Sequence, residues 1–310
     1  MSHEKRPMST AEPDRSRAFA HRLQGRPSLT AEAVTIARAL EHLKPEGERI
    51  VDDPWAHLFL SPPARGALAA WSRSLSARLL RRLGPSGTTY VPLRHRFIDD
   101  HLAAALDDGA AQVVLLGAGY DTRAYRFAEQ LAGRPVFEVD LASISRNKAA
   151  VLERHADEMP ATNVVRVEID FETEALGDVL VAAGFRTGVP TFFTWEGVPM
   201  YLTRAAVIAT LDAVHALSGP GSQLAHDMWF VVDDPGPLGT ARRVAPSALS
   251  LIGEPVTFAV HPEDYEALLG RHGFVMSDCL LSSELQARYA GNARAMVDDS
   301  MYVLCATRTS

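Results

Sequence analysis

The sequence has little cysteine, only three lysines and no long apolar run. Its two cysteines, Cys279 and Cys305, form neither a disulfide framework nor a zinc-ligand spacing. The apolar runs fall far short of the roughly 20 residues that cross a bilayer. The charged, proline-broken N-terminus lacks the apolar stretch of a secretion signal. A formal charge of −7 argues against a protein that coats nucleic acid or an anionic membrane. We expect a cytoplasmic protein that binds neither nucleic acid nor a membrane, and the sequence leaves its oligomeric state open.

Several catalytic motifs are missing as well. The chain has no G-x-S-x-G elbow and no P-loop lysine, which excludes common hydrolase and nucleotide-phosphatase sites. Its eleven histidines are scattered, and no pair combines zinc-ligand spacing with a nearby carboxylate. We therefore predict no metal site.

What is present describes a globular protein with a sizeable core, at 47% hydrophobic and 22% charged residues. Residues 1–25 lack apolar periodicity and are predicted to be a disordered or draped tail. Residues 26–110 show helical spacing and are predicted to form a helical cap. Residues 111–310 alternate short apolar runs with helical segments, which predicts a Rossmann-like core. The Pro- and Gly-rich segment 232–257 is expected to be a lid or insert within this single domain.

The apolar runs of the core are typical of buried strands. Alternation with helices predicts right-handed βαβ units in an α/β, doubly wound, mostly parallel sheet. The last two runs, separated by a long connection, predict an antiparallel C-terminal strand. The predicted strands are 113–116, 135–140, 163–170, 190–197, 221–229, 273–281 and 300–308.

The sharpest motif is the turn after the first strand, VVLLGAGYDTRAYR. Gly117 and Gly119 would let a ligand approach the backbone, next to the free N–H groups of a helix N-terminus. Ligands of doubly wound sheets bind at this end of the strands. A merely tight turn is the alternative that the glycines alone leave open.

Residues around this turn bear on the ligand. Glu138 and Asp140 end the second strand about 20 residues on, where an acid can hydrogen-bond ribose hydroxyls. A dinucleotide fingerprint needs a third small residue, but Tyr120, Asp121 and Thr122 follow Gly119. Asp121 would repel a diphosphate and tolerate a positively charged ligand. The pattern favours S-adenosyl-L-methionine, with S-adenosyl-L-homocysteine as product, over a nicotinamide dinucleotide.

These segments carry a family resemblance. LGAGYDTRAYR, FEVD, DFETE and TFFTWEGVPMYL, preceded by ARALEH, VDDPWAHLFL and PLRHRFIDD, resemble the leucine carboxyl methyltransferase family. More narrowly, the chain is similar to the bacterial branch of S-adenosylmethionine-dependent O-methyltransferases. The resemblance covers roughly residues 28–308 in order, and it implies a class I methyltransferase-like fold.

The resemblance implies roles for individual cofactor-binding residues. Gly117, in the same turn as Gly119, would approach the methionine portion of the cofactor. Arg94 would hold the cofactor's carboxylate, with Arg96 as the competing match and a surface salt bridge as the ordinary alternative. Asp140 would take the ribose hydroxyls, with Glu138 as the competing choice because neighbouring strand residues alternate faces.

Three more acids and one aromatic complete the implied cofactor site. Asp170 and Phe171 would bracket the adenine, and Glu196 would point into the crevice beside the sulfonium. Asp121 would face the positively charged ligand. A helix cap and a core aromatic are the ordinary alternatives for Asp170 and Phe171.

The predicted reaction is methyl transfer to a carboxylate or hydroxyl of a small metabolite, possibly in secondary metabolism. A carboxylate acceptor is already ionised at neutral pH and needs no base. Tyr201 is a candidate acceptor contact, with a core tyrosine as the alternative. His226, which with Asp227 is expected to face the crevice, is the candidate base for a hydroxyl, with an ordinary polar pair at a strand end as the alternative. Two rivals remain open: an NAD(P)-dependent oxidoreductase and a non-catalytic cofactor-binding protein.

Overall fold

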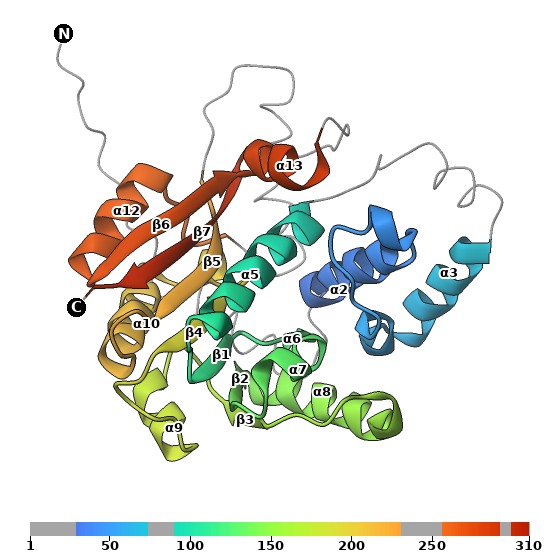
Figure 1. Cartoon of the computed structure of the whole chain (residues 1–310), viewed down its shortest axis with the longest axis horizontal. Coiled ribbons are helices and arrows are strands. Elements are labelled where there is room, and N and C mark those ends of the chain that lie inside the picture. The colour runs from blue at the N-terminus through green and yellow to red at the C-terminus, as the bar shows by residue number, and fades with distance from the viewer. Residues whose placement is uncertain (1–28, 74–89, 231–255, 292–298, 310) are drawn as a thin grey trace, which may run out of the picture.

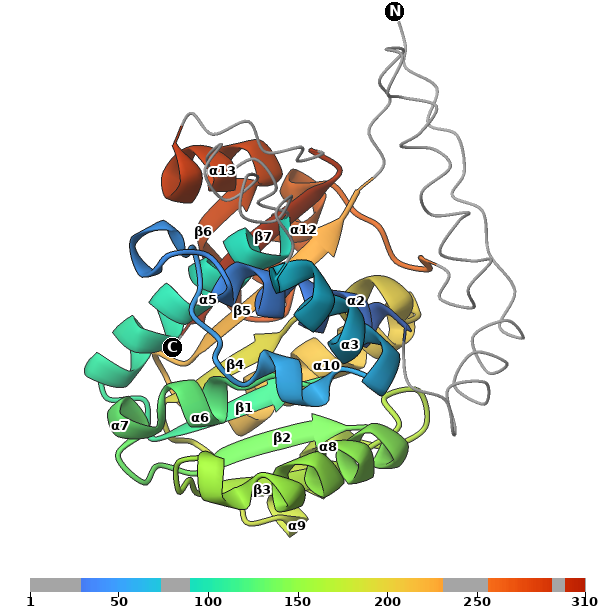
Figure 2. The same ribbon diagram turned by 90° about the vertical axis from the view of Figure 1, so that its right-hand side faces the viewer.

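A computed structural model describes residues 29–73, 90–230, 256–291 and 299–309. Its centre is a seven-stranded sheet in the order β3-β2-β1-β4-β5-β7-β6. Strands β1 to β5 are parallel, whereas β7 pairs antiparallel with both β5 and β6. Figure 2 shows β2 and β3 at one edge of the sheet and β6 and β7 at the other. This arrangement confirms the predicted class I methyltransferase-like fold. The strands are β1 (Gln112–Leu116), β2 (Val136–Asp140), β3 (Val164–Glu168), β4 (Thr191–Trp195), β5 (Gln223–Trp229), β6 (Phe274–Leu281) and β7 (Met301–Arg308).

Helices cover both faces of the sheet (Figure 1). Alternation along each strand divides the apolar side chains between two cores: Val114 and Leu116 pack on one face, and Val113 and Leu115 on the other. We call these the α10 core and the α5 core after the helices that cover them. The helices are α2 (Leu29–His42), α3 (Pro62–Arg73), α5 (Tyr90–Asp107), α6 (Arg123–Arg126), α7 (Ala128–Leu131), α8 (Ala142–Arg154), α9 (Leu176–Ala182), α10 (Arg204–Leu217), α12 (Pro262–Arg271) and α13 (Ser282–Ala290), with 3-10 turns η1 (Glu46–Glu48), η2 (Ala56–Phe59), η3 (Ala156–Glu158) and η4 (Pro199–Tyr201).

The seven predicted strands are all present, and their ends differ from the expected ones by at most two residues. The sequence predicted only a connection between the last two strands, but α13 lies there. Its buried Leu285 packs into the α5 core. Within the predicted helical cap, the segment after Pro54 forms only the short 3-10 turn η2. The predicted tail 1–25 lies outside the described residues, as does the predicted lid except for 256–257.

The N-terminal segment, residues 29–73, lies beside α5, on the side away from α10 and α12 (Figure 1). Helix α2 contacts both α5 and η2. Among the described residues no strand precedes β1, so the predicted helical character of this region is confirmed there. No helix of the described ranges is both long and apolar enough to span a membrane.

Candidate functional site

The glycine turn after β1 packs tightly against the loop after β4. Gly117 has φ +67° and Gly119 has φ +45°, a left-handed backbone that disfavours side chains. A Cβ atom on Gly117 would lie only 2.2 Å from Cγ2 of Val198. The turn therefore requires glycine at 117 both for its conformation and for the close approach of the β4 loop.

Asp140, at the end of β2, is tied to the same turn. Its Oδ2 accepts a hydrogen bond from the Gly119 N–H at 2.5 Å, and its Oδ1 accepts one from the Leu141 N–H at 2.7 Å. Burial raises the pKa of Asp140 to about 6, although both backbone donors favour the ionised form. Glu138, the competing acid, is buried elsewhere and pairs with Lys148 at 2.8 Å. Of the two acids, only Asp140 lies at the glycine turn.

Arg94 lies inside the protein between two strand ends. Its Nε donates to Oε1 of Glu196 at 2.8 Å, its Nη2 lies 2.7 Å from the same oxygen, and its Nη1 donates to Oδ2 of Asp227 at 2.5 Å. Glu196 follows β4 and Asp227 belongs to β5. Arg96, the competing match, is exposed and pairs with Asp100 on its own helix. Only the first of the two arginines belongs to the site.

A second buried arginine, Arg123, meets the same carboxylate. Its Nη1 lies 2.7 Å from Oε2 of Glu196 and 2.5 Å from Oδ2 of Asp121. Burial opposes ionisation of both acids. Arg123 nevertheless holds the pKa of Asp121 below its usual range, and Arg94 does most to hold that of Glu196 well below it. Asp121, two residues before α6 begins, also accepts from the backbone N–H of Arg123.

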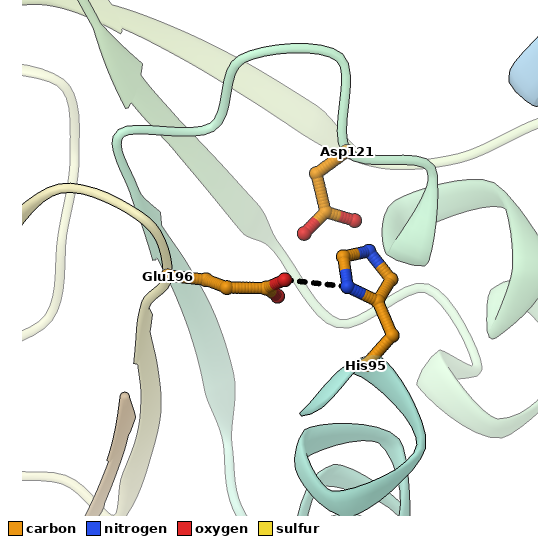
Figure 3. Close-up of side chains that lie close together, drawn as sticks. All are labelled: His95, Asp121 and Glu196. Carbon is orange, nitrogen blue, oxygen red and sulfur yellow. Dashed lines mark ion pairs between the residues drawn. The ribbon is translucent and has the colours of Figure 1, made fainter. Parts of the chain in front are cut away.

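His95 completes this cluster (Figure 3). Its Nδ1 lies 2.5 Å from Oε1 of Glu196, and one potential ligand atom from each of His95, Asp121 and Glu196 lies within 4.8 Å of the others. Burial lowers the pKa of His95 despite the nearby carboxylate. The three residues have metal-ligand chemistry, but Arg94 and Arg123 already contact the carboxylate oxygens. As folded, the group is an ion-pair cluster in which guanidiniums supply the positive charge.

The N-terminal segment is bonded directly to the glycine turn. Arg38 of α2 donates to the backbone oxygen of Tyr120 and to Oδ2 of Asp53, each at 2.8 Å. The same Asp53 oxygen accepts from the hydroxyl of Thr122 at 2.8 Å. The side chains of Arg38, Asp53 and Thr122 are all buried. Arg38 and Asp53 thus hold the backbone of Tyr120 and the side chain of Thr122 in place.

Asp99 of α5 extends the network to the helix after the turn. Its carboxylate accepts from Nε of Arg123 at 2.7 Å and from both terminal nitrogens of Arg126, at 2.6 and 3.1 Å. Burial opposes ionisation, but Arg126 and then Arg123 hold the pKa of Asp99 below its ordinary value. The turn is therefore bordered by ion pairs on α5 and on the N-terminal segment alike.

Asp170 and Phe171 follow β3 and are both half-buried. Oδ1 of Asp170 accepts from the Glu172 N–H at 3.0 Å, and Phe171 packs against the α10 core. Ile169, just before them, donates its N–H to the backbone oxygen of Asp140 at 2.9 Å. The chain after β3 therefore runs next to the end of β2.

The two predicted catalytic residues lie in different surroundings. Tyr201 ends η4 and is half-buried, five residues beyond Glu196. His226 was expected to face the crevice, and the structure corrects this. Its ring points to the α10 face, is fully buried, and its Nε2 lies 3.2 Å from the hydroxyl of Tyr265. The reason is strand alternation: neighbouring Asp227 takes the face of Arg94, so His226 must take the other.

Sequence reasoning missed most of the ion-pair network. The residues that it did not place in the site are Arg38, Asp53, His95, Asp99, Arg123 and Arg126. A signal existed, because all six lie in the segments ARALEH, VDDPW, RHRFIDD and DTRAYR that carry the family resemblance. Asp227 was expected to face the crevice together with His226, and only Asp227 lies against Arg94. Charged residues of opposite sign within apolar segments indicate that buried ion pairs form, but the sequence does not show which residues pair with which.

Comparison with known sequences agrees with these segments. A family model described as "Leucine carboxyl methyltransferase" matches residues 31–215. A Frankia alni protein named "Putative S-adenosyl-L-methionine-dependent methyltransferase" is 34% identical over 284 residues, which cover 89% of this chain and 92% of that one. A relative of the same description from Mycobacterium bovis is 35% identical over 204 residues. That match covers 63% of each chain, so this chain spans less than two thirds of the mycobacterial relative.

Comparison with solved structures supports the fold alone. A Thermobifida fusca protein described as a "putative methyltransferase" superposes with a TM-score of 0.52 at 15% identity, covering 87% of this chain and 97% of that one. A DUF574 family protein from Streptomyces avermitilis gives 0.51 at 17% identity, covering 88% and 96%.

Proposed function

The chain belongs to the leucine carboxyl methyltransferase family, and from that premise we propose that it is an S-adenosyl-L-methionine-dependent O-methyltransferase acting on a small molecule. Its preferred acceptor is a carboxylate, which would become a methyl ester. A hydroxyl is the second acceptor class that the same fold can serve.

One observation carries the choice of cofactor: the charge balance of the buried network beside the glycine turn. Among the described residues, five carboxylates meet four guanidiniums there, so one negative charge is left over when all are ionised. S-adenosyl-L-methionine bears an ammonium, a sulfonium and one carboxylate, and so brings one net positive charge. A nicotinamide dinucleotide brings a negatively charged diphosphate instead. Opposite charge therefore favours the methyl donor. The carboxylates are Asp53, Asp99, Asp121, Glu196 and Asp227, and the guanidiniums are Arg38, Arg94, Arg123 and Arg126.

The residues at the strand ends fit the parts of this cofactor. Asp140 would accept from the ribose hydroxyls, because its oxygens lie at the turn where β1 ends. The methionine portion would approach the backbone of the Gly117 turn, where the Val198 side chain fills the space that a side chain on residue 117 would take. Arg94 would bind the cofactor carboxylate, and Asp170 and Phe171 would lie next to the adenine. Glu196, predicted beside the sulfonium, is proposed instead to bind the neighbouring ammonium, because its carboxylate is paired with Arg94. Asp121 would add negative charge near the sulfonium.

The bound cofactor supplies an electrophilic methyl group, and the chain supplies position and a dry environment. A carboxylate acceptor is ionised at neutral pH, so in-line placement and exclusion of water are enough. Tyr201, close in sequence to Glu196, is the proposed acceptor contact. A hydroxyl acceptor would need a base. His226 could serve only after a rearrangement, because its ring is closed off behind Tyr265.

Calorimetric titration tests the cofactor assignment. We expect binding of S-adenosyl-L-methionine and S-adenosyl-L-homocysteine and none of NADH or NADPH. Asp140→Ala should abolish that binding, whereas Asp157→Ala, which removes an exposed acid in η3, should not change it. Binding of NADH or NADPH would instead favour an NAD(P)-dependent oxidoreductase.

Methyl transfer itself needs a second experiment. Labelled cofactor is incubated with a panel of small carboxylic acids and phenols, and the products are treated with mild base. A methyl ester releases methanol under these conditions and a methyl ether does not, so the volatile label identifies the acceptor class. Tyr201→Phe should raise KM for the acceptor and leave the cofactor Kd unchanged. Cofactor binding without any transfer across the panel would favour a non-catalytic binding protein.

A further inference from the structure

Asp227 is a buried carboxylate that contributes to the charge balance of the network but has no assigned contact with cofactor or acceptor. It lies near the end of β5 and is fully buried. Burial raises its pKa, and the charge of nearby Glu196 acts in the same direction. Placing two acids so close together is costly, and replacement by an uncharged residue would avoid that cost. The contacts of Asp227 show what the charge does.

Each carboxylate oxygen of Asp227 holds a different part of the site. Oδ2 accepts from Nη1 of Arg94 at 2.5 Å, and Oδ1 accepts from the backbone N–H of Gly197 at 2.7 Å. Gly197 has φ +70°, and a Cβ atom there would lie 3.7 Å from two nitrogens of Arg94. The acid thus fixes both the guanidinium and the peptide directly after Glu196.

The remaining donors of Arg94 explain why its position matters. Nε and Nη2 both reach Oε1 of Glu196, so the guanidinium lies between two carboxylates from neighbouring strands. Without Asp227, one side of this planar group would lose its partner. Arg94 could then turn away from Oε1 of Glu196, whose other oxygen would stay paired with Arg123.

We propose that Asp227 is a positioning residue for the amino-acid end of the cofactor, acting through Arg94 and the Gly197 peptide. This inference rests on the proposed function, in which Arg94 and Glu196 bind the cofactor carboxylate and ammonium. Asp227 itself does not touch the ligand. Its effect is therefore confined to ligands that have an amino-acid end.

Two ligands separate this role from a general structural one. S-adenosyl-L-homocysteine has the amino-acid end, whereas 5′-methylthioadenosine shares the adenosine and the sulfur but lacks it. In Asp227→Asn, the side-chain oxygen can still accept from Gly197, but the charge opposite Arg94 is gone. We expect Kd for S-adenosyl-L-homocysteine to rise by about tenfold to a hundredfold, the effect of losing one charge-assisted hydrogen bond. Kd for 5′-methylthioadenosine should change by less than about threefold.

Glu41→Gln is the matched control. Glu41 is also a buried acid, paired with Lys44 at 2.7 Å and accepting from the Ile50 N–H, but it belongs to α2 and contacts none of these groups. Its loss should lower the melting temperature without changing the ratio of the two affinities. Equal weakening of both ligands by Asp227→Asn, or no weakening of either, would overturn the positioning role. If the wild-type chain binds neither ligand, the proposed function itself fails, and the role of Asp227 falls with it.

A double-mutant cycle tests the route through Arg94. If Asp227 acts through this guanidinium, Asp227→Asn should weaken the binding of S-adenosyl-L-homocysteine far less in an Arg94→Lys background than in the wild type. Additive effects would overturn the route. Melting curves of all four proteins verify that each is folded at the temperature of the titration.

Discussion

Arg38 and Asp53 form a 2.8 Å ion pair from which solvent is excluded, and this pair joins the N-terminal segment to the glycine turn. Arg38 also bonds the backbone of Tyr120, and Asp53 bonds the hydroxyl of Thr122. Two side chains far upstream of β1 therefore hold the loop that is proposed to bind the cofactor. The N-terminal segment is therefore in direct contact with the proposed cofactor site.

Asp53→Asn should be strongly destabilising. The carboxylate also accepts from the backbone N–H groups of Trp55 and Ala56, so the substitution keeps the shape but leaves Arg38 buried without its counter-charge. We expect a loss of about 3 kcal/mol in the free energy of unfolding, measured by urea denaturation.

Its neighbour provides the control for this substitution. Asp52 is 54% exposed and makes only surface pairs with His42 and Arg49. Asp52→Asn should change the free energy of unfolding by less than about 0.5 kcal/mol. Similar losses for the two variants would contradict a special role for the buried pair.

Gly117→Ala should prevent cofactor binding and destabilise the fold. The new Cβ would overlap Val198 and would force a side chain into a left-handed conformation. Gly133→Ala is the control, because Gly133 has φ +78° but nothing within 4 Å of the added atom. The control should cost about 1 to 2 kcal/mol of backbone strain alone. In thermal unfolding, we expect Gly117→Ala to lose more stability than Gly133→Ala. A smaller loss than in the control would show that the loop after β4 can move away from residue 117.

Cofactor affinity should depend on pH through Asp140. Its pKa of about 6 in the free protein means that the carboxylate is increasingly protonated below that pH. If ribose binding requires the ionised form, affinity falls by about tenfold per pH unit below pH 6 and is flat above pH 7. Titrations at pH 5 to 8 in buffers of different ionisation enthalpy would also detect the proton released on binding. Affinity that stays constant down to pH 5 would refute the ribose role.

His226 should contribute to acid destabilisation. Burial lowers its pKa to about 4, from an ordinary value of 6.5 in the unfolded chain. Between these values the unfolded chain binds more protons, so the free energy of unfolding falls as pH decreases from 6.5 to 4. The contribution of one histidine is at most about 1.4 kcal/mol per pH unit. His226→Gln should reduce this slope in urea titrations, and an unchanged slope would contradict the burial of a neutral ring.

The family resemblance and the alternating pattern of the sequence determined the fold class. Apolar runs of strand length that alternate with helices are typical of a parallel sheet covered on both faces. This pattern can be recognised within short stretches of the sequence. The ends of these strands also placed Gly117, Asp140 and Glu196 at one edge, because the carboxyl ends of parallel strands meet there. Helix α13 escaped prediction because its apolar surface is small and its burial depends on α5.

Which charges meet was decided only by the tertiary structure. Arg94 and Arg96 are two residues apart on one helix, and packing against the sheet puts the first inside and leaves the second in solvent. His226 and Asp227 are neighbours, and the register of β5 sends them to opposite faces. Glu196 meets Arg94 across 102 residues of chain and Arg123 across 73. Such pairs follow from three-dimensional proximity, because a buried charge is stable only where the fold brings it an opposite one.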